Sequence, residues 1–171
     1  MLDRAKKTSL TPQAYRDAMS RFAGAVTIVT TDGPAGLRGV TVSAAVSISD
    51  NPPTVAICLN RNRDENRWFA DNGCFAINIL VETQIELARA FAGEGHLDMA
   101  ERFALGTWNK LATGAPALAG ARTALDCSVR DVNLVHTHYV VMGEVMAVAA
   151  SEPGHALAYL DRDYRAIGGS R

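Results

Sequence analysis

The stretch GVTVSAAVSISDNPP, residues 39–53, carries the pattern that decides the fold. Successive side chains of a β-strand point to opposite faces, and a single strand here places five apolar residues on one face: Val40, Val42, Ala44, Val46 and Ile48. The other face then carries Thr41, Ser43, Ala45, Ser47 and Ser49. We expect the first face to be core. The second is too small and too rich in hydroxyls for an ordinary solvent face, so we interpret it as a ligand surface.

The segments on both sides of this stretch also predict strands. AVTIVTT (25–31) is a β-branched run, and the turn DGPAG (32–36) joins it to the opening strand as a hairpin. Pro52 and Pro53 cannot donate to a sheet ladder and therefore end the strand. TVAICLN (54–60) is nearly all apolar, which predicts a strand buried on both faces.

The rest of the chain alternates short helices with further strands. We expect an amphipathic helix from Thr11 to Gly24 that presents Tyr15, Met19 and Phe22, a short helix that ends at Gly73, and a third over residues 83–93. Strands are expected at 74–80, 122–135, 138–151 and 155–168. Six or seven strands with short turns and three short helices predict a mainly β fold, an antiparallel closed or half-closed barrel rather than a doubly wound parallel sheet.

Length and charge point to a single domain with a small partner. We expect one domain over residues 1–171, with residues 1–10 flexible. Seventeen basic and eighteen acidic residues give a net charge of −1, which favours neither nucleic acid nor an anionic membrane as partner. The sequence shows no signal peptide and no membrane span. Its three cysteines are isolated in apolar surroundings, which favours reduced thiols. Together these features predict a cytoplasmic protein.

Common catalytic and nucleotide motifs are missing. The chain contains neither G-x-G-x-x-G nor a phosphate-binding P-loop, and no serine lies in G-x-S-x-G. His136 and His138 would share a strand face and could ligate a metal with His96, although no third ligand stands at local spacing.

A candidate anion site follows the buried strand. In LNRNRDENRW (59–68), asparagines and arginines gather where a strand gives way to a helix start, and free N–H groups there favour a phosphate. The same side chains would also suit an exposed loop. The hydroxyl strand could hold a flat polar ring, and Asn60–Asn62 with Asn66 could hold a phosphate. Flavin mononucleotide (FMN) has this shape, as do other ligands.

Five segments resemble the short-chain flavin reductases in order and spacing: RFAGAVTIVTT, GVTVSAAVSISDNPPTVAICLNRN, CFAINIL, LARAFAG and THYVVMGEV. The resemblance covers residues 15–167. It implies an FMN-binding split β-barrel, a homodimer, and reduction of FMN or FAD by NADH or NADPH, with the reduced flavin passed to a separate monooxygenase.

The resemblance also implies a set of site residues. Thr41, Val42, Ser43 and Ala44 match the strand along the flavin ring, Ser47 and Ser49 the hydroxyls toward the ribityl chain and phosphate, and Asn60, Arg61 and Asn62 the phosphate end. Phe91, Ala92 and Gly93 match a turn near the ring, and Tyr164 matches a flavin-site wall. His138 matches a histidine beside the flavin and the nicotinamide, while Thr137 replaces the acid that precedes it in the family.

Four functions are compatible with these residues. An NAD(P)H-dependent flavin reductase is the main hypothesis, with His138 as the catalytic residue and hydride transfer between the two cofactors as the chemistry. The corrinoid reductases that act on cob(II)yrinate a,c-diamide are a second branch that the chain resembles, and reductases paired with pyrimidine-ring-opening monooxygenases are a third. A flavin-binding module for storage or redox sensing is the alternative without turnover.

Overall fold

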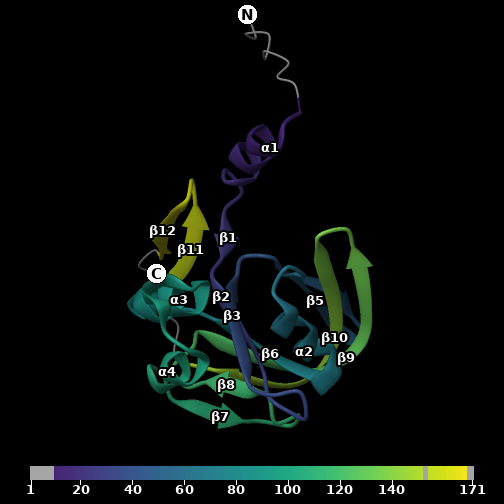
Figure 1. Ribbon diagram of the computed structural model, residues 1–171. Helices are drawn as coiled ribbons and strands as arrows, with labels where there is room; N and C mark the ends of the chain where they lie inside the picture. The colour runs from purple at the N-terminus through teal and green to yellow at the C-terminus, as the bar shows by residue number, and fades with distance from the viewer. Residues whose placement is uncertain (1–9, 152–153, 169–171) are drawn as a thin grey trace, which may run out of the picture.

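The computed structural model describes residues 10–151 and 154–168, and it is mainly β. Its largest sheet has the order β3-β2-β6-β9-β10-β5-β4, and all neighbouring strands in it are antiparallel, as expected (Figure 1). Its strands are β2 (Thr27–Thr31), β3 (Arg38–Val42), β4 (Ala45–Asp50), β5 (Pro53–Asn60), β6 (Cys74–Ile79), β9 (Thr123–Val135) and β10 (His138–Ala150). The sheet curls into an open, split β-barrel, the fold class that the sequence predicts.

The stretch 39–53 forms both edges of this sheet. It is not one strand, because β3 ends at Val42, β4 begins at Ala45, and the two pair with different neighbours: β3 with β2, and β4 with β5. Ser43 and Ala44 carry the chain across the opening of the barrel, and the Ala44 carbonyl accepts a hydrogen bond of 3.1 Å from the Cys58 amide. A fifteen-residue stretch thus fixes where the sheet starts and where it ends.

The break changes which side chains of β4 face the core, and this corrects one expectation. In β3, Val40 and Val42 pack against the barrel core, and after the break Ala45 does so. The alternation has therefore shifted by one residue. As a result, Val46 and Ile48, predicted to be core, are 58% and 54% exposed.

Two smaller sheets complete the strands. β1 (Gly24–Ala25) pairs with β11 (Ala156–Leu160), and β11 pairs with β12 (Asp163–Ile167). β7 (Trp108–Lys110) pairs with β8 (Pro116–Leu118). The sequence pattern predicts one strand over 155–168 and at most seven strands in all. The described chain instead folds 155–168 into a hairpin, since Asp161 and Arg162 form a turn with φ of 52° and 63°.

The helices are short. They are α1 (Pro12–Met19), α2 (Trp68–Asn72), α3 (Ile85–Ala92) and α4 (Met99–Ala104), with 3-10 turns η1 (Asp64–Arg67), η2 (Glu82–Gln84) and η3 (Glu94–His96). Thr11 caps α1 by accepting a hydrogen bond of 3.1 Å from the Ala14 amide. The helix ends at Met19 rather than near Gly24, and it projects away from the sheets with no buried residue (Figure 1).

The core consists of two main clusters on opposite sides of β2. Val29 faces the interior of the barrel, where Phe69 of α2 packs with residues of β5, β6, β9 and β10. Ile28 faces the cluster that joins α3 and α4 to the sheet, which includes Phe91 and Phe103. Because both faces of β2 are covered, all five of its residues are buried. α3 is thereby fixed against β3, where the site lies.

Several smaller expectations concern the ends and the thiols. The predicted flexibility of residues 1–10 falls, except for Leu10, outside the described residues. Cys74 and Cys127 are buried free thiols as predicted, while Cys58 is half-buried. In residues 10–151 and 154–168, no helix is long and apolar enough to cross a membrane.

Candidate functional site

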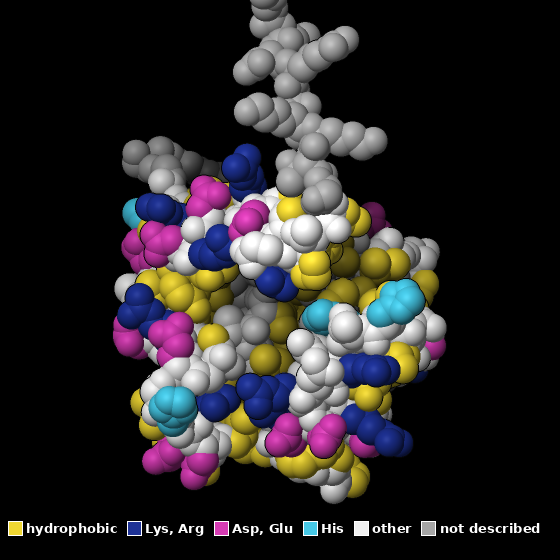
Figure 2. Space-filling model, turned by 45° about the horizontal axis from the view of Figure 1, so that its top comes forward, with side chains coloured by type: hydrophobic (Ala, Val, Ile, Leu, Met, Phe, Trp, Pro, Cys, Tyr) yellow, Lys and Arg dark blue, Asp and Glu magenta, His cyan; other side chains and the backbone are white. Residues whose placement is uncertain are grey.

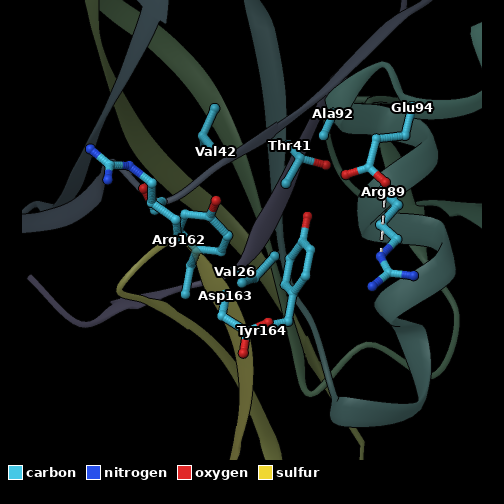
Figure 3. Close-up of a pocket in the computed structure, with 11 residues that line it drawn as sticks. Val26, Thr41, Val42, Arg89, Ala92, Glu94, Arg162, Asp163 and Tyr164 are labelled. Carbon is cyan, nitrogen blue, oxygen red and sulfur yellow. Dashed lines mark ion pairs between the residues drawn. The ribbon is translucent and has the colours of Figure 1, made fainter. Parts of the chain in front are cut away.

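A pocket of about 370 Å³ opens where β3, the end of α3 and the β11–β12 hairpin meet. Figure 3 shows its lining: Val26, Thr41, Val42, Ser43, Arg89, Ala92, Glu94, Tyr159, Arg162, Asp163 and Tyr164. Figure 2 views the molecule from above and shows a hollow in this face, with basic and histidine side chains near its rim. The volume lies in the range of small-molecule sites.

The wall formed by β3 is held rigidly by side-chain hydrogen bonds to the backbone. The Thr41 hydroxyl donates to the Ala88 carbonyl of α3 at 2.7 Å, which ties β3 to the helix. The Thr27 hydroxyl donates to the Val42 carbonyl at 3.0 Å. Ser43 follows as an exposed residue outside any strand. The strand thus presents a fixed edge that ends at the crossover of the barrel.

The end of α3 supplies a second wall. Ala92 lines the pocket, and Gly93, with φ of 99°, ends the helix in the left-handed conformation that favours glycine. Phe91 does not reach the pocket. Its ring is 1% exposed and packs edge-on against Phe103 with centroids 5.1 Å apart, so the side chain predicted to contact the cofactor belongs to the core.

The β11–β12 hairpin forms the third wall and carries two tyrosines. Tyr159 and Tyr164 are paired in register, and their rings meet edge to face with centroids 5.2 Å apart. The Tyr164 hydroxyl points toward β3 in Figure 3. Burial raises the pKa of the Tyr164 phenol, and the negative charge of Glu94 raises it further, so the hydroxyl keeps its proton and can donate a hydrogen bond.

The tip of this hairpin is fastened to α1. The Asp161 amide donates to the Ser20 carbonyl at 2.7 Å, and the Arg162 guanidinium donates to the Asp17 carboxylate. This hydrogen bond raises the pKa of Arg162 and lowers that of Asp17. The guanidinium of Arg162 is directed away from the pocket in Figure 3, so its alkyl chain provides the lining.

The other predicted residues lie beyond the pocket, near the crossover of the barrel. The Ala44 carbonyl accepts a hydrogen bond from the Cys58 amide of β5. Asn60 lies two residues further along β5 and pairs with His138 of β10. Asn60 and His138 therefore lie at the same end of the barrel as Ser43, outside the lining of the pocket. Ser47 and Ser49 lie further along β4, where they pair with Val55 and Thr54.

The side chains around Asn60 are engaged in local structure. The Asn60 Oδ1 accepts a hydrogen bond from the Asn62 amide at 2.9 Å, and the Arg61 amide donates to the Thr137 carbonyl at 3.0 Å. Asn66 is 3% exposed, its amide nitrogen donates to the Asn60 carbonyl, and its oxygen accepts from Arg38. Both ends of the Asn66 side chain are thus used inside the fold, and its binding of a phosphate stays a prediction.

The ring of His138 has a hydroxyl partner. The Thr137 hydroxyl lies 2.9 Å from Nδ1 of His138. A hydroxyl orients the ring but brings no charge, so the imidazole lacks the electrostatic support that a carboxylate would give. In the described part of the chain, no three His, Cys, Asp or Glu side chains gather as a metal site.

Comparison with known proteins identifies the family. Residues 19–168 match the family described as flavin reductase like domain. The chain belongs to this family. It is 44% identical over 155 residues to a protein of Cronobacter sakazakii named FMN reductase (NADH) RutF, covering 91% of this chain and 92% of that one. A Methylorubrum extorquens protein named FMN reductase (NADH) RutF 1 is also 44% identical, over 95% of this chain and 80% of its own.

Solved structures of the flavin reductase family have the same fold. A protein from Haemophilus somnus 129PT described as a flavin reductase superposes with a TM-score of 0.88 at 34% identity, covering 92% of this chain and all of the other. The NADH:FAD oxidoreductase SgcE6 of Streptomyces globisporus C-1027 gives a TM-score of 0.86 at 25% identity, over 98% and 100%.

The structure of this flavin reductase family member adds pocket residues that the sequence analysis did not single out: Val26, Arg89, Glu94 and Asp163. Tyr159 and Arg162 also line the pocket. The one signal for Arg89 was a lone positive charge in the last turn before the FAG sequence. Val26 lies in RFAGAVTIVTT, where it is one apolar residue among several, whereas Glu94 and Asp163 lie outside the five segments that carry the resemblance.

Proposed function

We propose that the protein is an NADH-dependent FMN reductase. The observation that carries the proposal is the pocket between β3 and the Tyr159–Tyr164 hairpin, in a chain 44% identical to proteins named FMN reductase (NADH). A flat polar ring fits between a rigid strand edge and an aromatic wall, and both features are present. FAD is an alternative flavin, since one structural relative is named an NADH:FAD oxidoreductase.

Residues on both sides of the crossover take part in this proposal. Backbone groups of Thr41, Val42, Ser43 and Ala44 hold the edge of the ring, and Tyr164 closes the opposite side. When bound, the flavin supplies the redox chemistry as acceptor of a hydride from the reduced nicotinamide. The protein holds both rings and excludes water, and His138, oriented by Thr137, positions the nicotinamide from the Asn60 end of the site.

The test is steady-state oxidation of NADH and NADPH with FMN, FAD, riboflavin and a cobalt(II) corrinoid as acceptors. We expect FMN-dependent oxidation of NADH, and slower oxidation of NADPH. Tight flavin binding without bleaching of the flavin under anaerobic NADH would instead identify a binding module. Reduction of the corrinoid faster than free reduced flavin can explain would identify a corrinoid reductase.

We further propose that the protein is a homodimer that passes reduced flavin to a separate monooxygenase. One structural relative is the flavin reductase of styrene monooxygenase from Pseudomonas putida S12. In the single chain, Tyr15, Met19 and Phe22 are 58%, 45% and 76% exposed, and Val46 and Ile48 of β4 are exposed as well. An eight-residue helix without buried residues is marginal by itself, and a second copy that covers it supplies the missing burial. Light scattering during size-exclusion chromatography measures the mass directly.

We place the protein in the cytoplasm because Cys58, Cys74 and Cys127 are free thiols, which suit a reducing compartment.

A further inference from the structure

Arg89 stands on the rim of the pocket between two carboxylates and a tyrosine ring. Its Nη1 lies 3.1 Å from the Glu86 carboxylate and its Nε 3.9 Å from that of Glu94. The centre of its guanidinium lies 5.9 Å from the centroid of the Tyr164 ring. The side chain is 44% exposed, so a ligand in the pocket can reach it.

The two carboxylates have different positions relative to the pocket. Glu94 lines it together with Arg89, whereas Glu86 lines a separate hollow between α3 and α4. At 3.9 Å and 61% exposure of Glu94, the Arg89–Glu94 pair contributes little stability. Glu94 is therefore a partner that an incoming anion can replace, while Glu86 can stay in contact and hold Arg89 in place.

The other charges that line the pocket have partners elsewhere. Arg162 is bonded to Asp17 of α1, and Asp163 lies 3.2 Å from Arg165. Figure 3 shows the Arg162 guanidinium directed away from the pocket and the Arg89–Glu94 pair at its side. Among the lining residues, Arg89 is the cation best placed for an anionic group of a ligand.

We propose that Arg89 binds a phosphate group of the nucleotide ligand and that Glu94 competes with that phosphate, so the pair sets how strongly the protein prefers phosphorylated ligands. The inference rests on the proposed function. An arginine fork presents paired N–H donors that match phosphate oxygens better than a single charge does. The phosphate belongs either to FMN or to the diphosphate of the nicotinamide nucleotide. This site differs from the segment Asn60–Asn62, to which the sequence analysis assigned the phosphate.

The first experiment measures flavin binding without any turnover. The dissociation constants of FMN and riboflavin are determined by quenching of flavin fluorescence for the wild type, Arg89→Gln, Glu94→Gln and Glu86→Gln. We expect Arg89→Gln to raise the FMN-to-riboflavin ratio of Kd about tenfold, as loss of a charge-assisted hydrogen bond predicts. Glu94→Gln should lower the ratio about threefold, and Glu86→Gln, the matched control, should change it less.

The ratio separates the phosphate from the ring. Any loss of stacking on Tyr164 affects FMN and riboflavin alike and cancels, as does a small loss of stability in a variant. Arg89→Lys serves as a second variant that keeps the charge but loses the fork, and it should fall between the wild type and Arg89→Gln.

The second experiment identifies the source of the phosphate. The KM of NADH is compared with that of reduced nicotinamide riboside, which has no phosphate, with riboflavin as acceptor. If Arg89→Gln changes this KM ratio and leaves the FMN-to-riboflavin ratio of Kd unchanged, the phosphate belongs to the nicotinamide nucleotide. If only the Kd ratio changes, the phosphate belongs to FMN. If Arg89→Gln leaves both ratios within about twofold of the wild type, the inference is wrong. If Arg89→Gln changes the FMN-to-riboflavin ratio of Kd but the wild type oxidises no NADH, the proposed function is wrong and the inference about Arg89 stands.

Discussion

Gly39→Ala is the substitution that most directly tests the packing behind the pocket. A Cβ built on Gly39 overlaps Cε1 of Phe91 and lies 2.8 Å from Cδ1 of Phe91 and 3.3 Å from Cζ of Phe103. These distances are far shorter than carbon atoms tolerate, and both rings are buried and in contact with each other. The methyl group therefore forces Phe91, and with it the last turn of α3, away from β3.

The expected cost follows from overpacking of a dense core. Added methyl groups in well-packed interiors typically cost about 1–3 kcal/mol, and for a chain of this size each kcal/mol lowers Tm by about 2–4 °C. Because the displaced turn carries Arg89 and Ala92, the Kd of FMN should rise as well. Urea denaturation measures the loss of stability, and flavin fluorescence measures binding.

Two further variants make this prediction specific. In Gly154→Ala the new Cβ meets Val81 Cγ1 at 3.4 Å, an ordinary contact, so stability should not fall. Combining Gly39→Ala with Phe91→Leu removes most of the overlap, and the double variant should be more stable than the two single losses predict, by about 0.5–3 kcal/mol. Gly39→Ala with unchanged stability and unchanged FMN binding would refute the assignment of Phe91 to the core behind the site.

Three other predictions concern the site and a buried thiol. His138→Ala should slow NADH-dependent flavin reduction in stopped-flow measurements without changing the Kd of FMN, and an unchanged rate removes His138 from the mechanism. Ser49→Ala with Arg61→Ala should weaken FMN more than riboflavin if the phosphate lies at that end; equal losses show that it does not. Burial raises the pKa of Cys127 from 9.0 to about 12, so a thiolate-selective reagent should label Cys58 and spare Cys127 in the native protein. Since the unfolded state ionises this thiol first, its contribution to stability should be lost as the pH rises above about 9.

Local patterns predicted most of the elements, because their signals lie within a few residues. The β-branched run before the DGPAG turn formed β2, and the apolar run after Pro52 formed β5, in which Val55, Ala56, Ile57 and Leu59 are buried. Pairing could not be predicted in the same way. Residues 39–53 read as one strand because their alternation is continuous. The break at Ser43 and Ala44 arises because β3 pairs with β2 at one edge of the sheet and β4 pairs with β5 at the other.

The candidate site was predictable only where one segment carries it. Thr41, Val42 and Ser43, which are consecutive in sequence, line the pocket together. The side chains of Phe91 and Asn66 are buried inside the fold, which the sequence did not reveal, because a residue beside a ligand and a residue that supports its neighbour look the same in sequence. The difference is the direction of the side chain: Phe91 faces Gly39, and Asn66 faces Arg38 and the Asn60 carbonyl.

The position of Arg89 shows why the remaining lining residues needed the fold. A lone arginine in the last turn of an amphipathic helix is most simply explained by the helix dipole and by a pair with Glu86 three residues earlier. Its relation to Glu94 depends on the turn at Gly93, and its relation to Tyr164 depends on a hairpin more than seventy residues away in sequence. A charge that appears local in sequence thus faces a pocket formed by three segments. Ligand selection at this pocket follows from tertiary structure that no single motif encodes.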